Sequence, residues 1–149
     1  MLTFREYTSA VDAVNQIVAE RMGINRTDHR VLEILSRRGP MAAGDLAKAS
    51  HLTTGAVTAV LDRLEEAGYV RRVRDTEDRR RVLVEETPEG VKTAMRYYQP
   101  LMDRSFESMT KYSADELAVI RDFMQGAAEI TVDVAEKLGA TSDEPPDAS

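Results

Sequence analysis

Apolar residues recur every three or four positions over much of the chain, the spacing of helices that bury one face. A first helix is predicted over residues 1–23, with Gly23 placed to end it. Its apolar stripe consists of Phe4, Tyr7, Val11, Val14, Val18 and Met22. A second, shorter helix is expected to begin with Thr27 as its N-cap and to end near Gly39 and Pro40.

Two short helices joined by a tight turn are expected next. The first covers residues 45–49, the turn covers 50–52, and Thr53 caps the second helix. The buried stripe of that second helix is Val57, Val60, Leu61 and Leu64. Gly68 suits the left-handed position that ends a helix. Together these signals predict a helix-turn-helix.

The apolar period then changes from three or four to two, which predicts strands over residues 69–74 and 82–84. Residues 75–78 are typical of a turn, so this segment is expected to be a β-hairpin with a charged tip. Thr87 and Pro88 follow as the N-cap and first residue of a long helix. Ser113 and Glu116 form a capping box before a last helix that reaches Leu138.

The predicted fold is mainly α with a small β-hairpin, a winged helix-turn-helix with N- and C-terminal dimerisation helices. We expect one domain over residues 1–138, with the winged helix at about 27–90 and a disordered tail at 139–149. The helices at 1–23 and 91–138 have apolar stripes that a module of about 70 residues could not fully cover. A homodimer interface built from both chain ends is the simplest solution.

Charge is distributed unevenly along the 149 residues, whose formal net charge is −6. Residues 113–149 contain nine acidic and two basic residues, so the acidity belongs to the C-terminal end. Six arginines stand within residues 71–81, and such a local cluster suffices for phosphate contact. The chain has no cysteine, which excludes disulfides, Cys-ligated zinc and thiol redox sensing. It has no signal peptide or membrane-span pattern, so we expect a cytoplasmic location and no membrane contact.

The second helix of the helix-turn-helix has the features of a DNA recognition helix. Its first residues Thr53, Thr54, Gly55 and Thr58 are small or polar and face away from the apolar stripe. Such residues at a helix N-terminus allow close approach to the major groove and to phosphates. Arg63, further along, is expected to act either as a phosphate clamp or as an ion-pair partner within the fold.

The hairpin tip is expected to be the wing. Arg79 and Arg80 are candidates to enter the minor groove, where a narrow groove concentrates negative potential, and the sequence does not say which one does so. Asp78 would orient a neighbouring arginine through a charge-assisted hydrogen bond. A solvated charged turn is the alternative for this segment.

Three segments resemble the MarR family of winged helix-turn-helix transcriptional regulators. They are residues 52–70 (LTTGAVTAVLDRLEEAGYV), 75–80 (DTEDRR) and 87–90 (TPEG), which resemble the recognition helix with the first wing strand, the wing signature and the helix opening after the wing. One departure is Ala59, where the family often has a larger polar or basic side chain.

The resemblance implies a homodimer whose terminal helices form the interface. It also implies binding to double-stranded DNA at a palindromic site, as a repressor released by a small aromatic or anionic ligand. Tyr97 and Tyr98 fall near the place where the resemblance puts an effector crevice, although tyrosines at helical spacing more often belong to a core.

Other function classes have little support in the sequence. There is no phosphate-cradling glycine loop, no nucleophile with a matched base and no carboxylate pair in a cleft-like setting, so we expect no enzyme and no cofactor. His29 and His51 lack the spacing of a metal site. The main alternative is a winged helix used for protein contact without specific DNA binding, which would show little of the salt dependence of DNA binding.

Overall fold

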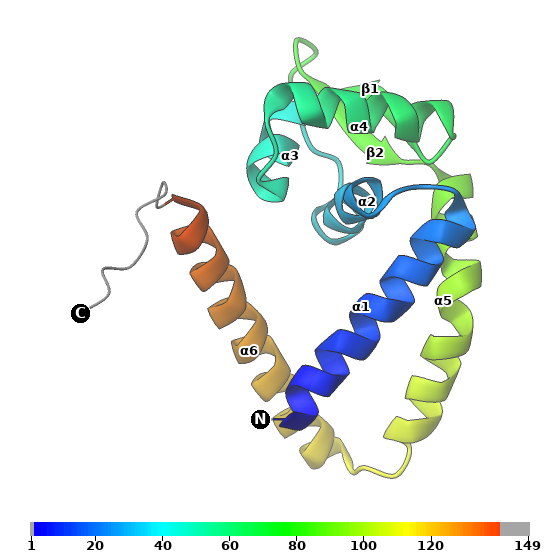
Figure 1. Cartoon of the computed structure of the whole chain (residues 1–149), viewed down its shortest axis with the longest axis vertical. Helices are drawn as coiled ribbons and strands as arrows, with labels where there is room; N and C mark the ends of the chain where they lie inside the picture. Colours follow the sequence, from blue (N-terminus) through cyan, green and yellow to red (C-terminus); the bar gives the residue numbers. More distant parts are fainter. Residues whose placement is uncertain (1, 141–149) are drawn as a thin grey trace. The chain divides into compact units, whose positions relative to one another are not determined.

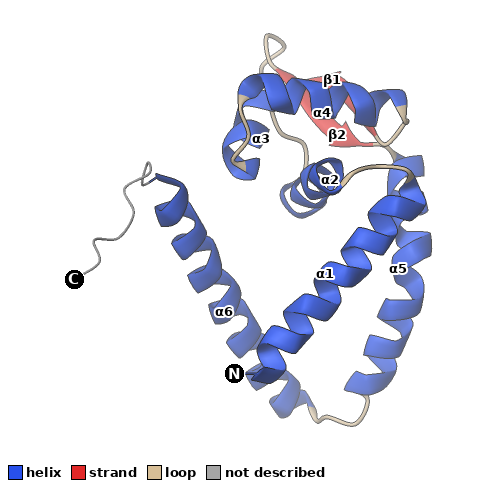
Figure 2. Cartoon of the chain, in the orientation of Figure 1, coloured by secondary structure: helices blue, strands red, loops and turns tan. Residues whose placement is uncertain are grey.

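The computed structural model describes residues 2–140 (Figure 1). The elements in chain order are α1 (Leu2–Met22), α2 (Arg26–Arg38), α3 (Ala43–Ser50), α4 (Thr54–Glu66), β1 (Val70–Arg74), β2 (Val82–Glu86), α5 (Pro88–Met109) and α6 (Ala114–Ala140). Figure 2 shows that the fold is mainly helical with one small hairpin, which confirms the predicted class. The chain divides into two compact units, Met1–Pro100 and Leu101–Ser149.

Three helix boundaries differ from those predicted. Asn25, rather than Thr27, caps α2, because its side chain accepts a hydrogen bond from the backbone N–H of Asp28 at 2.8 Å. Helix α3 begins at Ala43, two residues early, without a side-chain cap. Helix α6 continues to Ala140 and so includes the first two residues of the predicted tail. The rest of that tail, residues 141–149, lies outside the described residues.

The core of the first unit lies among α2, α3, α4 and the hairpin, and the C-terminal end of α1 closes it. Its largest fully buried side chains are Leu46, Leu61, Leu64, Val31, Val57 and Val84. The turn between α3 and α4 depends on His51, which adopts a left-handed conformation with φ of 56°. Buried Ser50 donates its hydroxyl to the carbonyl of Leu46 at 2.6 Å. This turn fixes the angle at which α4 leaves α3.

The hairpin is fixed at its base from both sides. Strands β1 and β2 pair antiparallel, with Val70 opposite Glu86 and Arg74 opposite Val82. Val84 also exchanges two backbone hydrogen bonds with Met41, in the segment before α3, at 2.8 and 3.0 Å. The hairpin therefore starts from a rigid base on the helix-turn-helix.

The junction between the hairpin and α5 requires a glycine. A Cβ atom added to Gly90 would lie 2.7 Å from the carbonyl oxygen of Tyr69, closer than such contacts occur. Thr87 caps α5 as predicted, since its hydroxyl oxygen accepts from the N–H of Gly90 at 2.9 Å. That hydroxyl also donates to the carbonyl of Gly68 at 2.6 Å. The start of α5 thus packs directly on the backbone before β1.

The second unit contains the end of α5 and the whole of α6. Ser113 and Glu116 form the predicted capping box at the start of α6, with bonds of 2.8 and 3.3 Å. None of the described side chains of this 27-residue helix is buried. Its large apolar residues are exposed instead, to 64% at Phe123 and 67% at Ile130. An amphipathic helix with an uncovered apolar face indicates a partner surface.

Candidate nucleic-acid interface

Helix α4 separates a buried face from an exposed one, as predicted. Thr53 is its N-cap, and its side-chain oxygen accepts from the N–H of Ala56 at 3.2 Å. Thr54, Gly55 and Thr58 are all exposed on the first two turns. The hydroxyl of Thr58 donates to the carbonyl of Thr54 at 2.9 Å, which leaves its oxygen available as an acceptor. The exposed start of α4 is therefore small, polar and open to close approach.

Arg63 lies further along α4 and is held within the fold. Its guanidinium donates to both carboxylate oxygens of Asp28 on α2, at 2.5 and 3.2 Å. Asp28 is only 2% exposed, whereas about half of the Arg63 side chain remains accessible. These hydrogen bonds raise the pKa of Arg63. The ion pair therefore joins α2 to α4, which is the internal role that the sequence left open for Arg63.

Asp28 is not among the candidate residues of the sequence analysis, although its position in the apolar pattern of α2 indicates that it is buried. It lies three, four and seven residues before Val31, Leu32 and Leu35, so it continues the apolar stripe of α2. A carboxylate on the buried face of a helix needs a cationic or hydrogen-bonding partner. The stripe thus predicts a buried ion pair, but it does not name the partner.

The arginines of the hairpin divide into paired and unpaired groups. Arg71 contacts Glu85 at 2.7 Å across the strands. Arg72 contacts Asp62 at 2.7 Å and also Glu65, so it fastens β1 to α4. Arg81 lies 3.6 Å from Asp45 and 4.0 Å from Asp75. Much of the basic cluster is therefore neutralised by the fold.

Arg79 and Arg80 differ from these arginines, because no ion pair involves either guanidinium within the described part of the chain. Asp78 accepts a hydrogen bond from the backbone N–H of Arg80 at 3.0 Å. Its expected role was to orient an arginine side chain, but it shapes the loop through the backbone instead. The carbonyl of Arg79 accepts from the guanidinium of Arg74 at 3.4 Å, a further bond that fixes the loop. Two exposed cations therefore project from an ordered tip.

The tip and the start of α4 lie toward the same end of the helix-turn-helix. Strand β1 runs back along α4, because Arg72 of β1 contacts Asp62 of α4. Past the tip, Arg81 lies 3.6 Å from Asp45 on α3, the helix before α4. Figure 1 shows the loop between β1 and β2 projecting at the end of α4 that follows α3. The hairpin tip and the start of α4 are therefore close to the same end of the helix-turn-helix.

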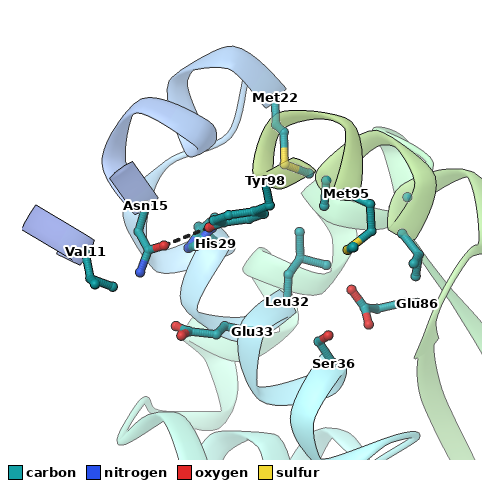
Figure 3. A pocket seen from close by; sticks show the side chains of 13 residues that line it. Val11, Asn15, Met22, His29, Leu32, Glu33, Ser36, Glu86, Met95 and Tyr98 are labelled. Carbon is teal, nitrogen blue, oxygen red and sulfur yellow. Dashed lines mark hydrogen bonds between the residues drawn. The ribbon is translucent and has the colours of Figure 1, made fainter. Parts of the chain in front are cut away.

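A separate pocket of about 250 Å³ lies between α1, α2 and α5 (Figure 3). Tyr98 lines it, and its hydroxyl donates to the side-chain oxygen of Asn15 at 2.7 Å. His29 Nε2 lies 2.9 Å from the same hydroxyl oxygen, and burial lowers the pKa of His29 against the opposing charge of Glu33. One residue from each of the three helices thus meets at this polar edge of the pocket.

The two adjacent tyrosines do not share a site. Tyr97 lines a separate hollow with Val14, Ile17, Val18 and Arg21, and its hydroxyl donates to the carbonyl of Arg21 at 3.3 Å. Consecutive positions on a helix point about 100° apart, so only Tyr98 faces the pocket. Glu86, which the sequence did not single out, is one of the charged residues of the pocket lining.

No group of three or more His, Asp or Glu side chains among residues 2–140 is placed to hold a metal ion. None of the described helices is long and apolar enough to cross a membrane.

The known proteins that this chain is similar to are transcriptional regulators. A sequence model of the MarR family matches residues 24–82. The HTH-type transcriptional regulator YcgE of Bacillus subtilis is 37% identical over 135 residues, which are 91% of this chain and 88% of that protein. The multiple antibiotic resistance protein MarR of Salmonella typhimurium is 32% identical over 100 residues, 66% of this chain and 69% of that protein.

A solved structure agrees with the fold. A mutant of S. aureus MepR bound to an oligodeoxyribonucleotide superposes with a TM-score of 0.58 at 19% identity, over 87% of this chain and 96% of that one. The sequence relatives and the winged helix-turn-helix geometry lead to one conclusion. This chain belongs to the MarR family and is a DNA-binding transcriptional regulator.

Proposed function

We propose that the protein binds a palindromic DNA site as a homodimer, with α4 in the major groove and the hairpin tip in the minor groove. The observation that carries this proposal is that no ion pair within residues 2–140 involves the guanidinium of Arg79 or Arg80. Both residues stand in the hairpin loop, which projects at the end of α4 that follows α3. Arginines neutralised within the fold would have had less charge available for DNA.

The start of α4 is the proposed reader of base sequence. Thr54 and Thr58 offer hydroxyl oxygens and methyl groups, which suit hydrogen bonds to base edges and contact with the methyl group of thymine. Gly55 has no neighbour within 4 Å of the position of a Cβ, so the backbone can approach the duplex there. Thr53 contributes by capping α4, which directs the N–H groups of the helix start toward phosphate.

The wing is the proposed minor-groove contact. A narrow minor groove has a strong negative potential, and an arginine inserted into it gains affinity without a base-specific hydrogen bond. The backbone bond from Arg80 to Asp78 supports an ordered tip, which lowers the entropy lost on insertion. Arg63 is bound to Asp28, so we assign it to positioning α4 and, through its exposed half, to a secondary phosphate contact.

The terminal helices are the proposed dimer interface. The exposed apolar residues of the second unit and the N-terminal half of α1 include Phe4, Tyr7, Leu101, Phe106, Val119, Ile120, Phe123, Ile130 and Leu138. A two-fold axis would bury such a stripe against its own copy and would present two α4 helices to successive major grooves.

Regulation by a small molecule is the remaining part of the proposal. The family resemblance supports a repressor that a ligand releases from DNA, and the pocket beside Tyr98 is the proposed ligand site. Tyr97 would contact a ligand only in its own hollow.

The test compares single alanine variants of the hairpin. Arg79→Ala and Arg80→Ala are measured on a specific and a scrambled duplex at two salt concentrations, with Arg71→Ala as the control because Arg71 is paired with Glu85. At least one tip variant should weaken binding on both duplexes and reduce the salt slope by about 2 for a dimer, or ~0.9 per lost contact. If both tip variants match the control, the wing has no role on DNA and the protein-contact function replaces this proposal.

A second measurement addresses α4. Thr54→Ala and Thr58→Ala should change which bases are preferred, by about 1–3 kcal/mol per lost contact, with little change in salt slope. Selection of bound sites from a random duplex library detects that change and shows whether the preferred site is a palindrome.

A further inference from the structure

The pocket beside Tyr98 has a distinctive balance of charge. Most of its wall is apolar and consists of Val11, Met22, Leu32, Val91, Ala94 and Met95. Its acidic side chains are Glu33 and Glu86, and no lysine or arginine is part of the lining. The family resemblance implies a small aromatic or anionic ligand, and an anionic one would meet two carboxylates here without a lysine or arginine in the lining.

Glu86 is the more buried of the two carboxylates. It is the last residue of β2 and half-buried, and that burial raises its pKa. The neighbouring Glu85 pairs with Arg71, whereas no side chain of residues 2–140 donates a hydrogen bond to Glu86. In Figure 3 the Glu86 carboxylate lies at the pocket near Met95 and Ser36. A partly desolvated carboxylate without a partner is stabilised when a cation arrives.

The other polar groups of the pocket do not reverse this charge. His29 has its pKa lowered by burial, so it adds no positive charge at neutral pH. Glu33 is exposed, so solvent screens its charge, and it also lines a neighbouring polar hollow that contains Asp12, Arg26 and Arg30. The pocket therefore keeps a negative potential that centres on Glu86.

Tyr98 adds an aromatic surface to this site. Its hydroxyl is already bound to Asn15 and lies beside His29 Nε2, which fixes the ring. A fixed tyrosine ring attracts an organic cation through its quadrupole. Apolar walls, one fixed aromatic ring and an unpaired carboxylate are together complementary to one class of small molecule.

We infer that this pocket binds a monovalent organic cation with an aromatic or apolar body, whose ammonium group contacts Glu86. The inference rests on the proposed function, because it names the ligand class of the site proposed above for regulation. Such a ligand would contact residues that are connected to both parts of the proposed DNA interface. Glu86 ends the second wing strand, and His29 directly follows Asp28, the residue that holds Arg63 of α4.

The test uses three probes that share one aromatic body and differ in charge. They are 1-naphthylmethylammonium, 1-naphthaleneacetamide and 1-naphthaleneacetate. The chain contains no tryptophan, so naphthalene fluorescence reports binding directly on the full-length protein without DNA. We expect the ammonium probe to bind about tenfold more tightly than the amide, since a charge-assisted hydrogen bond is worth at least that factor, and the acetate to bind most weakly.

Glu86→Gln removes the charge and keeps the shape, so it should abolish the preference for the cation and leave amide binding unchanged. Glu85→Gln is the matched control, because this neighbouring carboxylate pairs with Arg71 and lies outside the lining. Circular dichroism and the unfolding midpoint establish that both variants are folded. The Gln side chain should be tolerated well at position 86, where burial disfavours the charged form.

Each outcome separates the two proposals. Equal binding of ammonium and amide probes, or an unchanged preference in Glu86→Gln, overturns the cation inference even if DNA binding is confirmed. A selective cation that binds with no effect on DNA affinity supports the ligand class but removes the regulatory part of the proposed function. If the unmodified protein shows no specific DNA binding, the proposed function is overturned but the cation inference is not, because the probe titration contains no DNA.

Discussion

The ion pair between Asp28 and Arg63 gives a prediction about how the recognition helix is held. Asp28→Asn keeps the size of a side chain that is 2% exposed, so it opens no cavity. It removes two charge-assisted hydrogen bonds and turns an amide N–H₂ or a weaker oxygen toward the guanidinium. Arg63 can recover water, because half of its side chain is accessible. The free energy of unfolding should fall by about 2 kcal/mol, the usual value of hydrogen bonds to charged groups.

Arg63→Met should destabilise the fold more than Asp28→Asn does. It leaves the carboxylate of Asp28 buried without its cation, and a buried charge cannot recover water. The double variant Asp28→Leu with Arg63→Met should be more stable than Arg63→Met alone, since replacing both partners by apolar groups of similar size is nearly neutral.

Urea unfolding at one fixed protein concentration measures these differences, because the stability of a dimer depends on concentration. DNA binding at two salt concentrations shows in addition whether Arg63 contacts phosphate. Asp28→Leu alone completes the cycle. If the effects of Asp28→Leu and Arg63→Met simply add in the double variant, the ion pair contributes no coupling energy and does not hold α4 on α2. An unchanged salt slope in the folded Arg63→Met variant would limit Arg63 to its structural role.

Three other predictions follow from single contacts. Gly90→Ala should cost at least about 2 kcal/mol in unfolding, because a Cβ would meet the backbone of Tyr69 at 2.7 Å. Gly55→Ala, with open space around it in α4, should keep or raise stability and should weaken DNA binding. Burial lowers the pKa of His29 in the folded chain, so as the pH falls the unfolded chain takes up a proton on His29 before the folded chain does. Urea titrations should therefore show the free energy of unfolding falling as the pH drops below about 6.5. The fall should be smaller in His29→Gln. Phe123→Asp should give monomers or unfolded chain in sedimentation, and a stable dimer would contradict the proposed interface.

The order of the elements and the helix-turn-helix could be predicted from the sequence, because their signals are local. Thr53 and Thr87 cap the helices that follow them, and Gly68 has the positive φ expected at a helix end. The change from helical to strand periodicity located the hairpin to within two residues. Each of these features depends on residues a few positions apart, so the order of residues along the chain is enough to predict it.

The tertiary structure decided which charges are available. The six arginines between residues 71 and 81 look alike in the sequence. In the structure three of them, Arg71, Arg72 and Arg81, pair with acidic side chains, and Arg74 donates to the carbonyl of Arg79. Within residues 2–140 no ion pair involves the guanidinium of Arg79 or Arg80. Asp28 and Arg63 are 35 positions apart, and Tyr98 and Asn15 are 83 apart. Glu86 likewise meets the pocket only because β2 ends beside α2 and α5. Such pairings depend on how the helices pack, since a residue's partners across the core follow from three-dimensional proximity and leave no fixed spacing in the chain.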